Sequence, residues 1–281
     1  MSDIQQYAKN ITVWNKQWEL ICDEMKKYGE TTPHFEDIIS ETESSVAKVI
    51  QQGIFNNLNL ITIPTSEIRH IWRFVKEKDT SKLVESRFIP QPEYASLNRM
   101  NDKDRLYSYF SISYKDSAGR DAIATGVKEI RATEEDEVWK CKFNFSTQET
   151  TLKIVDFSPV CRIPKDEKDY TKFLIRNIGK EYPINKDFLT YWLLQTLLQI
   201  FHESKMFAPI DKNENEDAQR LKYKPFHVIC DYLERNGYHG IIYRSTVFPR
   251  GHCLTLFNPK YADCIFDTLE IVDISSALKT K

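Results

Sequence analysis

Residues 225–245 read PFHVICDYLERNGYHGIIYRS, in which a helical pattern gives way to an extended one. Apolar side chains spaced three and four apart predict a helix over 225–236, and Gly237 closes it, because glycine tolerates the conformation of a helix C-cap. The apolar run that follows predicts a strand over 240–245, and a further apolar strand is expected over 254–257. Helix and strand therefore follow each other closely in this part of the chain.

Other segments of the chain also predict both helices and strands. Alternating apolar and polar side chains predict a half-buried strand over 138–145, and a second strand is expected over 152–157. The apolar run 188–202 predicts a buried helix that is too short and too often interrupted for a membrane span. The mostly charged run 211–217 is predicted to be a surface loop. Because helices and strands are mixed rather than strictly alternating, we expect an α+β fold.

The first part of the chain has only helical patterns. Trp14, Trp18, Ile21 and Met25 recur at helical spacing and stop before Gly29, so an amphipathic helix is expected there. A second helix is predicted over 32–52, with Gly53 ending it. We therefore expect a helical segment over 1–65 and a separate domain over 66–281.

Composition excludes several classes of protein. The 281 residues are 41% hydrophobic and 28% charged, which is typical of a globular protein rather than a disordered one. The formal net charge of -2 gives no overall attraction for nucleic acid or an anionic membrane, so neither is expected as a partner. The first residues contain no secretory signal pattern, and the six cysteines form no C-x-x-C pair. We expect a cytoplasmic protein with reduced thiols.

Common motifs of catalysis are absent from the sequence. The six histidines form neither H-E-x-x-H nor a close cluster, so no metal site is expected. Neither a Rossmann nor a P-loop glycine pattern occurs. His252 and Cys253 are adjacent, but neighbouring side chains on a strand point to opposite faces. The sequence therefore predicts a core cysteine beside a surface histidine rather than a thiol nucleophile with its base.

A dispersed set of short motifs carries a family resemblance. In chain order they are Trp72-Arg73, Asn98-Arg99-Met100-Asn101, Tyr107-Ser108-Tyr109, the stretch 125–131 and Tyr243-Arg244-Ser245. Together they resemble the RES-domain family, which is named for an arginine, a glutamate and a serine. Its members are toxins that destroy NAD and usually pair with an antitoxin. The resemblance covers 72–257 and implies a core similar to the ADP-ribosyltransferase fold.

The resemblance also implies a role for each matched residue. Arg73 stands in the position of the family arginine, with Arg87 as a rival, Glu129 in that of the glutamate and Ser245 in that of the serine. The expected catalytic residues are Glu129, Arg73, Ser245 and Tyr109. The expected NAD-binding residues are Arg99, Asn101, Arg87 and Tyr243. No cofactor or metal is expected, since NAD is the substrate.

These residue types suit the implied chemistry. Cleavage between nicotinamide and ribose passes through an oxocarbenium-like state, and nicotinamide leaves as a neutral group, so one carboxylate is sufficient. Glu129 can stabilise the developing charge, hold the ribose hydroxyls or orient the incoming water or phosphate. The pyrophosphate needs arginine forks, for which Arg73 and Arg99 are candidates. Tyr109 can stack on the nicotinamide ring, and Ser245 can bind the ligand or Glu129.

We therefore expect an NAD glycohydrolase or phosphorylase that arrests growth and is restrained by an antitoxin. A transferase that moves ADP-ribose to a macromolecule would use the same site. A non-catalytic NAD sensor is a third alternative, because Asp102-Lys103-Asp104 replaces the proline and glycine usual in the family. For the helical segment 1–65 the sequence leaves three roles open: oligomerisation, contact with the antitoxin, or stability alone.

Overall fold

The computed structural model describes residues 13, 15–16, 19–29, 31–41, 45–92, 98–114, 119–147, 151–158, 194–195, 197–199, 202 and 215–280. The chain divides into two compact units. We call Met1–Ile61 with Ser158–Asp211 the helical unit, and Thr62–Phe157 with Lys212–Lys281 the sheet unit. The expected division into 1–65 and 66–281 stays a prediction.

The helical unit contains the two predicted N-terminal helices in altered form. Residues 19–24 are helical and continue into η1 (Met25–Tyr28), which ends at Gly29 with a φ of 54°. The end before Gly29 is confirmed, while Trp14 and Trp18 lie outside the described residues. Over the second predicted helix, 32–52, the structure has the shorter elements α2 (Phe35–Glu41), α3 (Ser45–Val49) and η2 (Ile50–Ile54), and η3 (Phe55–Ile61) follows them.

The prediction that Gly53 ends a helix is wrong. Gly53 lies inside η2, and helical structure continues beyond it. A Cβ atom at this position would lie 2.4 Å from Cδ1 of Leu197, so glycine is needed for the close approach of that side chain. Leu197 belongs to the predicted helix 188–202, of which the described residues 194–195, 197–199 and 202 are helical.

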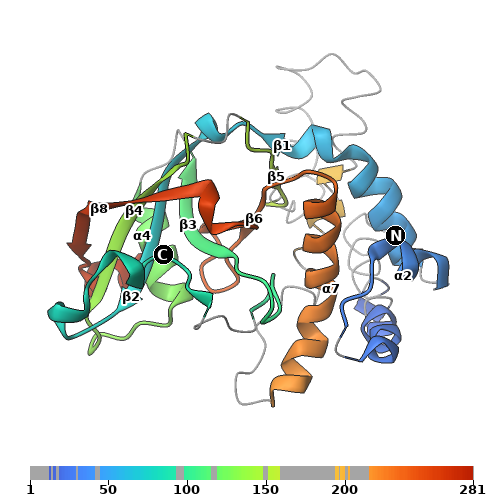
Figure 1. Cartoon of the computed structure of the whole chain (residues 1–281), viewed down its shortest axis with the longest axis horizontal. Helices are drawn as coiled ribbons and strands as arrows, with labels where there is room; N and C mark the ends of the chain where they lie inside the picture. The colour runs from blue at the N-terminus through green and yellow to red at the C-terminus, as the bar shows by residue number, and fades with distance from the viewer. Residues whose placement is uncertain are drawn as a thin grey trace, which may run out of the picture. The chain divides into compact units, whose positions relative to one another are not determined.

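The sheet unit is built on one eight-stranded sheet, with the order β1-β5-β6-β7-β3-β2-β4-β8 (Figure 1). The pair β5–β6 is parallel and all others are antiparallel, which confirms the α+β class. In chain order the strands are β1 (Thr62–Ile63), β2 (Ile68–Lys76), β3 (Ser108–Tyr114), β4 (Val138–Phe145), β5 (Ile154–Asp156), β6 (Gly240–Arg244), β7 (His252–Leu256) and β8 (Ala262–Ile271). The helices of this unit are η4 (Thr65–Glu67), η5 (Thr80–Lys82), η6 (Glu85–Arg87), α4 (Gly119–Glu129), α7 (Glu216–Arg235), η9 (Pro259–Tyr261) and α8 (Ile274–Lys279). All four strands expected from the sequence alone are present, as β4 to β7.

Side chains cover both faces of this sheet. One apolar cluster contains Phe110 and Phe143 together with Phe88 from the segment after η6. A second cluster lies on the opposite face, where α4 packs against β2, β3 and α8. Gly126 allows this contact, because a Cβ there would lie 2.1 Å from the ring of Phe74. The prediction of a half-buried strand over 138–145 is therefore too simple, since Lys140, on the polar side of the alternation, is only 5% exposed.

Helix α7 corrects two predictions. It begins at Glu216 rather than at Pro225, and Pro225 lies in its interior. The side chain of Asn215 caps the helix by accepting a hydrogen bond from the backbone N–H of Ala218, and Glu216 and Asp217 favour a helix N-terminus. The end of the charged run 211–217 is thus helical rather than a loop, and 211–214 lie outside the described residues.

An opening forms where β2 and β3 separate. Their pairing ends at Trp72↔Ser111. Strand β2 nevertheless stays paired with β4 as far as Lys76, and β3 stays paired with β7 as far as Ser108. The two strands therefore diverge beyond the last shared pair, and the gap between them is free to receive side chains and a ligand.

Candidate active site

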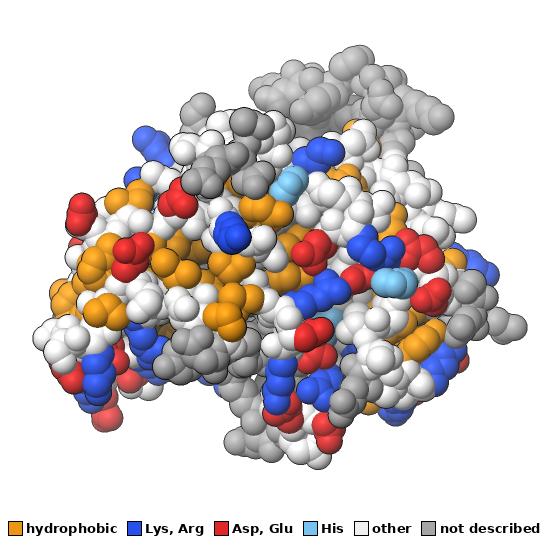
Figure 2. Space-filling view, viewed as in Figure 1, with side chains coloured by type: hydrophobic (Ala, Val, Ile, Leu, Met, Phe, Trp, Pro, Cys, Tyr) orange, Lys and Arg blue, Asp and Glu red, His pale blue; other side chains and the backbone are white. Residues whose placement is uncertain are grey.

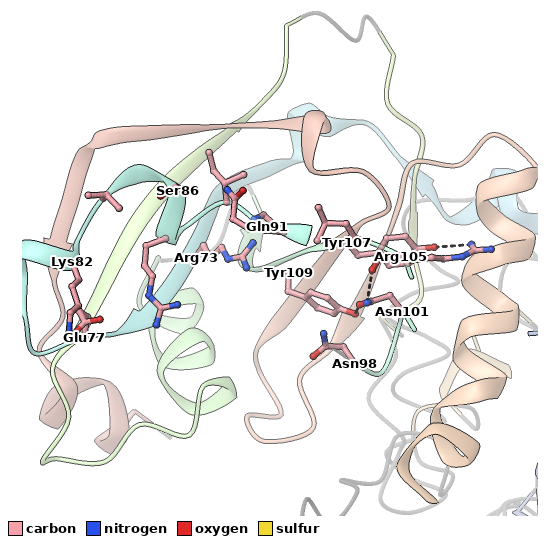
Figure 3. A pocket seen from close by; sticks show the side chains of 15 residues that line it. Arg73, Glu77, Lys82, Ser86, Gln91, Asn98, Asn101, Arg105, Tyr107 and Tyr109 are labelled. Atoms are coloured by element: carbon pink, nitrogen blue, oxygen red, sulfur yellow. Dashed lines mark hydrogen bonds between the residues drawn. The ribbon is translucent and has the colours of Figure 1, made fainter. Parts of the chain in front are cut away.

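A cavity of about 620 Å³ lies at this opening (Figure 3). Its walls come from the end of β2, the start of β3 and the segments 82–91 and 98–107. Cavities of this volume are typical of small-molecule sites. The lining residues are Arg73, Glu77, Lys82, Val84, Ser86, Arg87, Ile89, Pro90, Gln91, Asn98, Asn101, Arg105, Leu106, Tyr107 and Tyr109.

Arg73 projects from β2 into this cavity. Its Nη1 atom is fully buried and has no hydrogen-bond partner among the described residues. Burial, together with the nearby positive charge of Arg87, lowers the pKa of Arg73 to about 10. An unpaired buried guanidinium beside a second cation is unfavourable unless an anion binds there.

The charges around the cavity favour an anionic ligand. Among the described residues, Arg73, Lys82, Arg87 and Arg105 line it, against the single carboxylate of Glu77. On the face drawn in Figure 2, basic and acidic side chains are interspersed. The formal net charge of the chain, -2, does not reveal the local excess of positive charge at the cavity.

Tyr109 and Asn101 form one end of the cavity (Figure 3). The hydroxyl of Tyr109 donates to Oδ1 of Asn101 over 2.5 Å, and burial raises the pKa of Tyr109 well above its usual value. The amide nitrogen of Asn101 donates to the backbone oxygens of Asp102 and Arg105, each over 2.8 Å. Asn101 therefore fixes the loop 101–105 and orients Tyr109, while its side chain borders the cavity.

Glu129 lies outside the lining of this cavity, at the last residue of α4. The hydroxyl of Ser245 donates to its Oε1 atom over 2.7 Å. Ser245 is 1% exposed, and its oxygen also accepts the backbone N–H groups of Val247 at 3.2 Å and Phe248 at 3.0 Å. With both backbone donors on its oxygen, the serine directs its single hydrogen at Glu129. The structure thus joins two of the predicted catalytic residues, which lie on different elements.

Tyr243 and Arg99 interact electrostatically with Tyr109, and Tyr243 also interacts with Glu129. Burial raises the pKa of Tyr243 well above its usual value, and the charges of Cys253, Glu129 and Tyr109 contribute to this rise. The positive charge of Arg99 lowers the pKa of both Tyr109 and Tyr243. Its guanidinium lies 5.7 Å from the centre of the Phe226 ring. Neither lines the cavity, so of the eight predicted site residues Arg73, Arg87, Asn101 and Tyr109 do so.

The sequence missed other members of the site. Lys82, Glu77 and Arg105 line the cavity although no motif includes them. Cys253 is buried, as predicted, but it also contacts Glu129, with its Sγ atom 3.5 Å from Oε1. No sequence signal predicts this contact, because it depends on the packing of α4 against β7.

No group of three or more His, Cys, Asp or Glu side chains suited to a metal ion occurs within the described ranges. In the same part of the chain, no helix has both the length and the apolar character needed to cross a membrane.

Comparison with known proteins identifies no family for this chain. No family model matches the chain, and a search of curated proteins finds no match. Among solved structures, one similar chain comes from the "Crystal structure of the M.tuberculosis MbcT-MbcA toxin-antitoxin complex". The superposition covers 80% of this chain and 95% of that one, with a TM-score of 0.36 and 8% sequence identity. At this level of similarity the superposition assigns neither a family nor a function.

Proposed function

We propose that the sheet unit binds NAD and cleaves the bond between nicotinamide and ribose, as an NAD glycohydrolase or phosphorylase of the RES type. The observation that carries the proposal is the buried Nη1 atom of Arg73, which has no hydrogen-bond partner in the described part of the chain and lies in a cavity that Arg87 also lines. A pyrophosphate supplies the missing acceptors, because its oxygens accept paired hydrogen bonds from a guanidinium fork. In this proposal the core is similar to the ADP-ribosyltransferase fold.

Glu129 supplies the carboxylate of the reaction. Ser245 holds its Oε1 atom, so the carboxylate has a fixed orientation. A fixed negative charge stabilises the oxocarbenium-like state more than a mobile one does, because no reorganisation is needed as the charge develops. Tyr109, at the end of the cavity, offers a ring face for stacking on nicotinamide.

The biological role that fits this activity is a toxin that depletes NAD in the cytoplasm. A cognate antitoxin would restrain it by covering the mouth of the cavity. Such a partner would carry acidic side chains, since the exposed Arg87 and Lys82 lie at the cavity.

The test is to incubate the purified protein with NAD, with and without phosphate, and to separate the products by chromatography. We expect nicotinamide release, and a Glu129→Gln variant is expected to lose turnover by about a hundredfold to a thousandfold while still folding. Glu135→Gln is the matched control, because Glu135 is an exposed carboxylate nearby in the sequence with no place in the site.

The products separate the possible reactions. ADP-ribose alone indicates hydrolysis, whereas an ADP-ribose phosphate that forms only with phosphate indicates phosphorolysis. A labelled macromolecule would instead indicate a transferase. Intact NAD with a folded protein that binds it would contradict catalysis and favour the sensor, and unchanged turnover in Glu129→Gln would reject Glu129 as the catalytic carboxylate.

A further inference from the structure

Cys253 is the second residue of β7 and is 5% exposed. Strand register places it opposite Ser111 on β3 and opposite Tyr243 on β6. Its Sγ atom donates to Oε1 of Glu129 over 3.5 Å, within the range of a sulfur hydrogen bond. This thiol therefore belongs to the surroundings of the proposed catalytic carboxylate.

Two donors meet on one oxygen of Glu129. Ser245 and Cys253 both donate to Oε1, from the end of β6 and from β7. No hydrogen bond to Oε2 occurs within the described part of the chain. Two donors approaching one oxygen from different elements fix the plane of the carboxylate, and they leave the second oxygen available to a ligand.

The Cys253 thiol is suited to donate a hydrogen bond and not to act as a nucleophile. Burial raises the pKa of Cys253 well above its usual value, and the negative charge of Glu129 raises it further. A thiol that keeps its proton is a weak nucleophile but retains its S–H donor. Tyr243 lies opposite Cys253 on the neighbouring strand β6, and its side chain lowers the pKa of the thiol, which is the opposite of the effect of burial. Tyr243, Cys253 and Glu129 thus form a row that runs from β6 through β7 to α4.

We propose that Cys253 is a positioning residue, which Tyr243 holds in place and which directs the free oxygen of Glu129 towards the substrate. The inference rests on the proposed function, because it acts through the same carboxylate. It also gives Tyr243 a role behind the site instead of a direct contact with NAD. An S–H donor is weaker than the O–H donor of Ser245 on the same oxygen, so the removal of Cys253 should have a smaller effect than the removal of Ser245.

The kinetic test compares three variants. Cys253→Ala is expected to lower kcat about tenfold with little change in the KM for NAD, because orientation is lost and binding is not. Cys253→Ser keeps a donor and is expected to recover most of this loss. Leu254→Val is the control, because Leu254 is its buried neighbour on β7 and packs in the cluster on the opposite face of the sheet. Wild-type kcat in Cys253→Ala, or an equal loss in Leu254→Val, would overturn the inference.

A spectroscopic test works without turnover. The S–H stretching band of a thiol lies apart from other protein vibrations and moves to lower frequency when the thiol donates to a carboxylate. We expect one band to vanish in Cys253→Ala and the same band to move to higher frequency in Glu129→Gln. If the wild-type protein releases no nicotinamide, the proposed function is wrong, and this band still decides the contact. A band that does not move in Glu129→Gln overturns the positioning role.

Discussion

Two arginines line the same cavity, and they differ in their acidic partners. Arg105 donates to Asp231 over 2.6 Å and to Glu234 over 2.9 Å, both on α7. Arg73, on β2, has Arg87 near it and forms no ion pair within the described residues. The two regions share one cavity but differ in whether the protein supplies the counter-charge.

The presence or absence of an acidic partner distinguishes Arg105, a cation that stabilises the fold, from Arg73, a cation that we expect to bind the ligand. Burial by itself would lower the pKa of Arg105, but its hydrogen bonds with Tyr107 and Asp231 raise it overall. For Arg73 burial prevails, and its pKa falls to about 10. A paired cation stabilises the fold, whereas an unpaired one reduces stability until a ligand binds. The region around Arg73 is therefore where we expect the anionic part of the substrate.

The largest expected effect in this comparison is on stability. Arg105→Met should lower the free energy of unfolding by about 2 kcal/mol, because it leaves the carboxylate of Asp231 with less compensation. That side chain is 7% exposed and keeps a contact with Arg235, so the loss is smaller than for a wholly buried pair. Urea denaturation measures the change.

The matched control is Arg250→Met, which removes the exposed ion pair with Asp121 and should have little effect. Equal losses of unfolding free energy in the two variants would show that the ion pairs of Arg105 stabilise the fold no more than an exposed ion pair does.

The next effect is on binding. Arg73→Lys should raise the KM for NAD about tenfold, or about 1.4 kcal/mol, because lysine cannot form the paired contact with a pyrophosphate. Steady-state kinetics measures it, with Arg87→Lys beside it. If Arg87→Lys has the larger effect, Arg87 is the family arginine and the placement of the first motif is wrong.

The smallest effect has the opposite sign. Arg73→Met should raise the free energy of unfolding of the ligand-free protein by about 1 kcal/mol, because it removes a buried unpaired charge near Arg87. NAD or its fragments should stabilise the wild-type protein but not this variant. A lower stability in Arg73→Met would show that Arg73 is structural, as Arg105 is.

Local patterns predicted much of the secondary structure. Period-two alternation and apolar runs placed β4, β5, β6 and β7, and a glycine with positive φ ended the first helix. The start of α7 was wrong because a capping residue and two acids outweighed an interior proline, Pro225. Strands β2 and β8 were not predicted. Their residues are mostly half-buried or exposed, and β8 lies at the edge of the sheet, so neither strand has the continuous apolar run of a buried strand.

The sequence by itself determined which kinds of side chain are present and in what order, including the arginines, the glutamate and the serine of the resemblance. Only the tertiary structure decided which of them meet. Glu129 and Ser245 come together because α4 packs beside the end of β6, and Cys253 joins them from β7. The cavity exists because β2 and β3 diverge after Trp72. The physical reason is that local backbone preferences act over a few residues, whereas strand pairing and helix packing join residues more than a hundred positions apart.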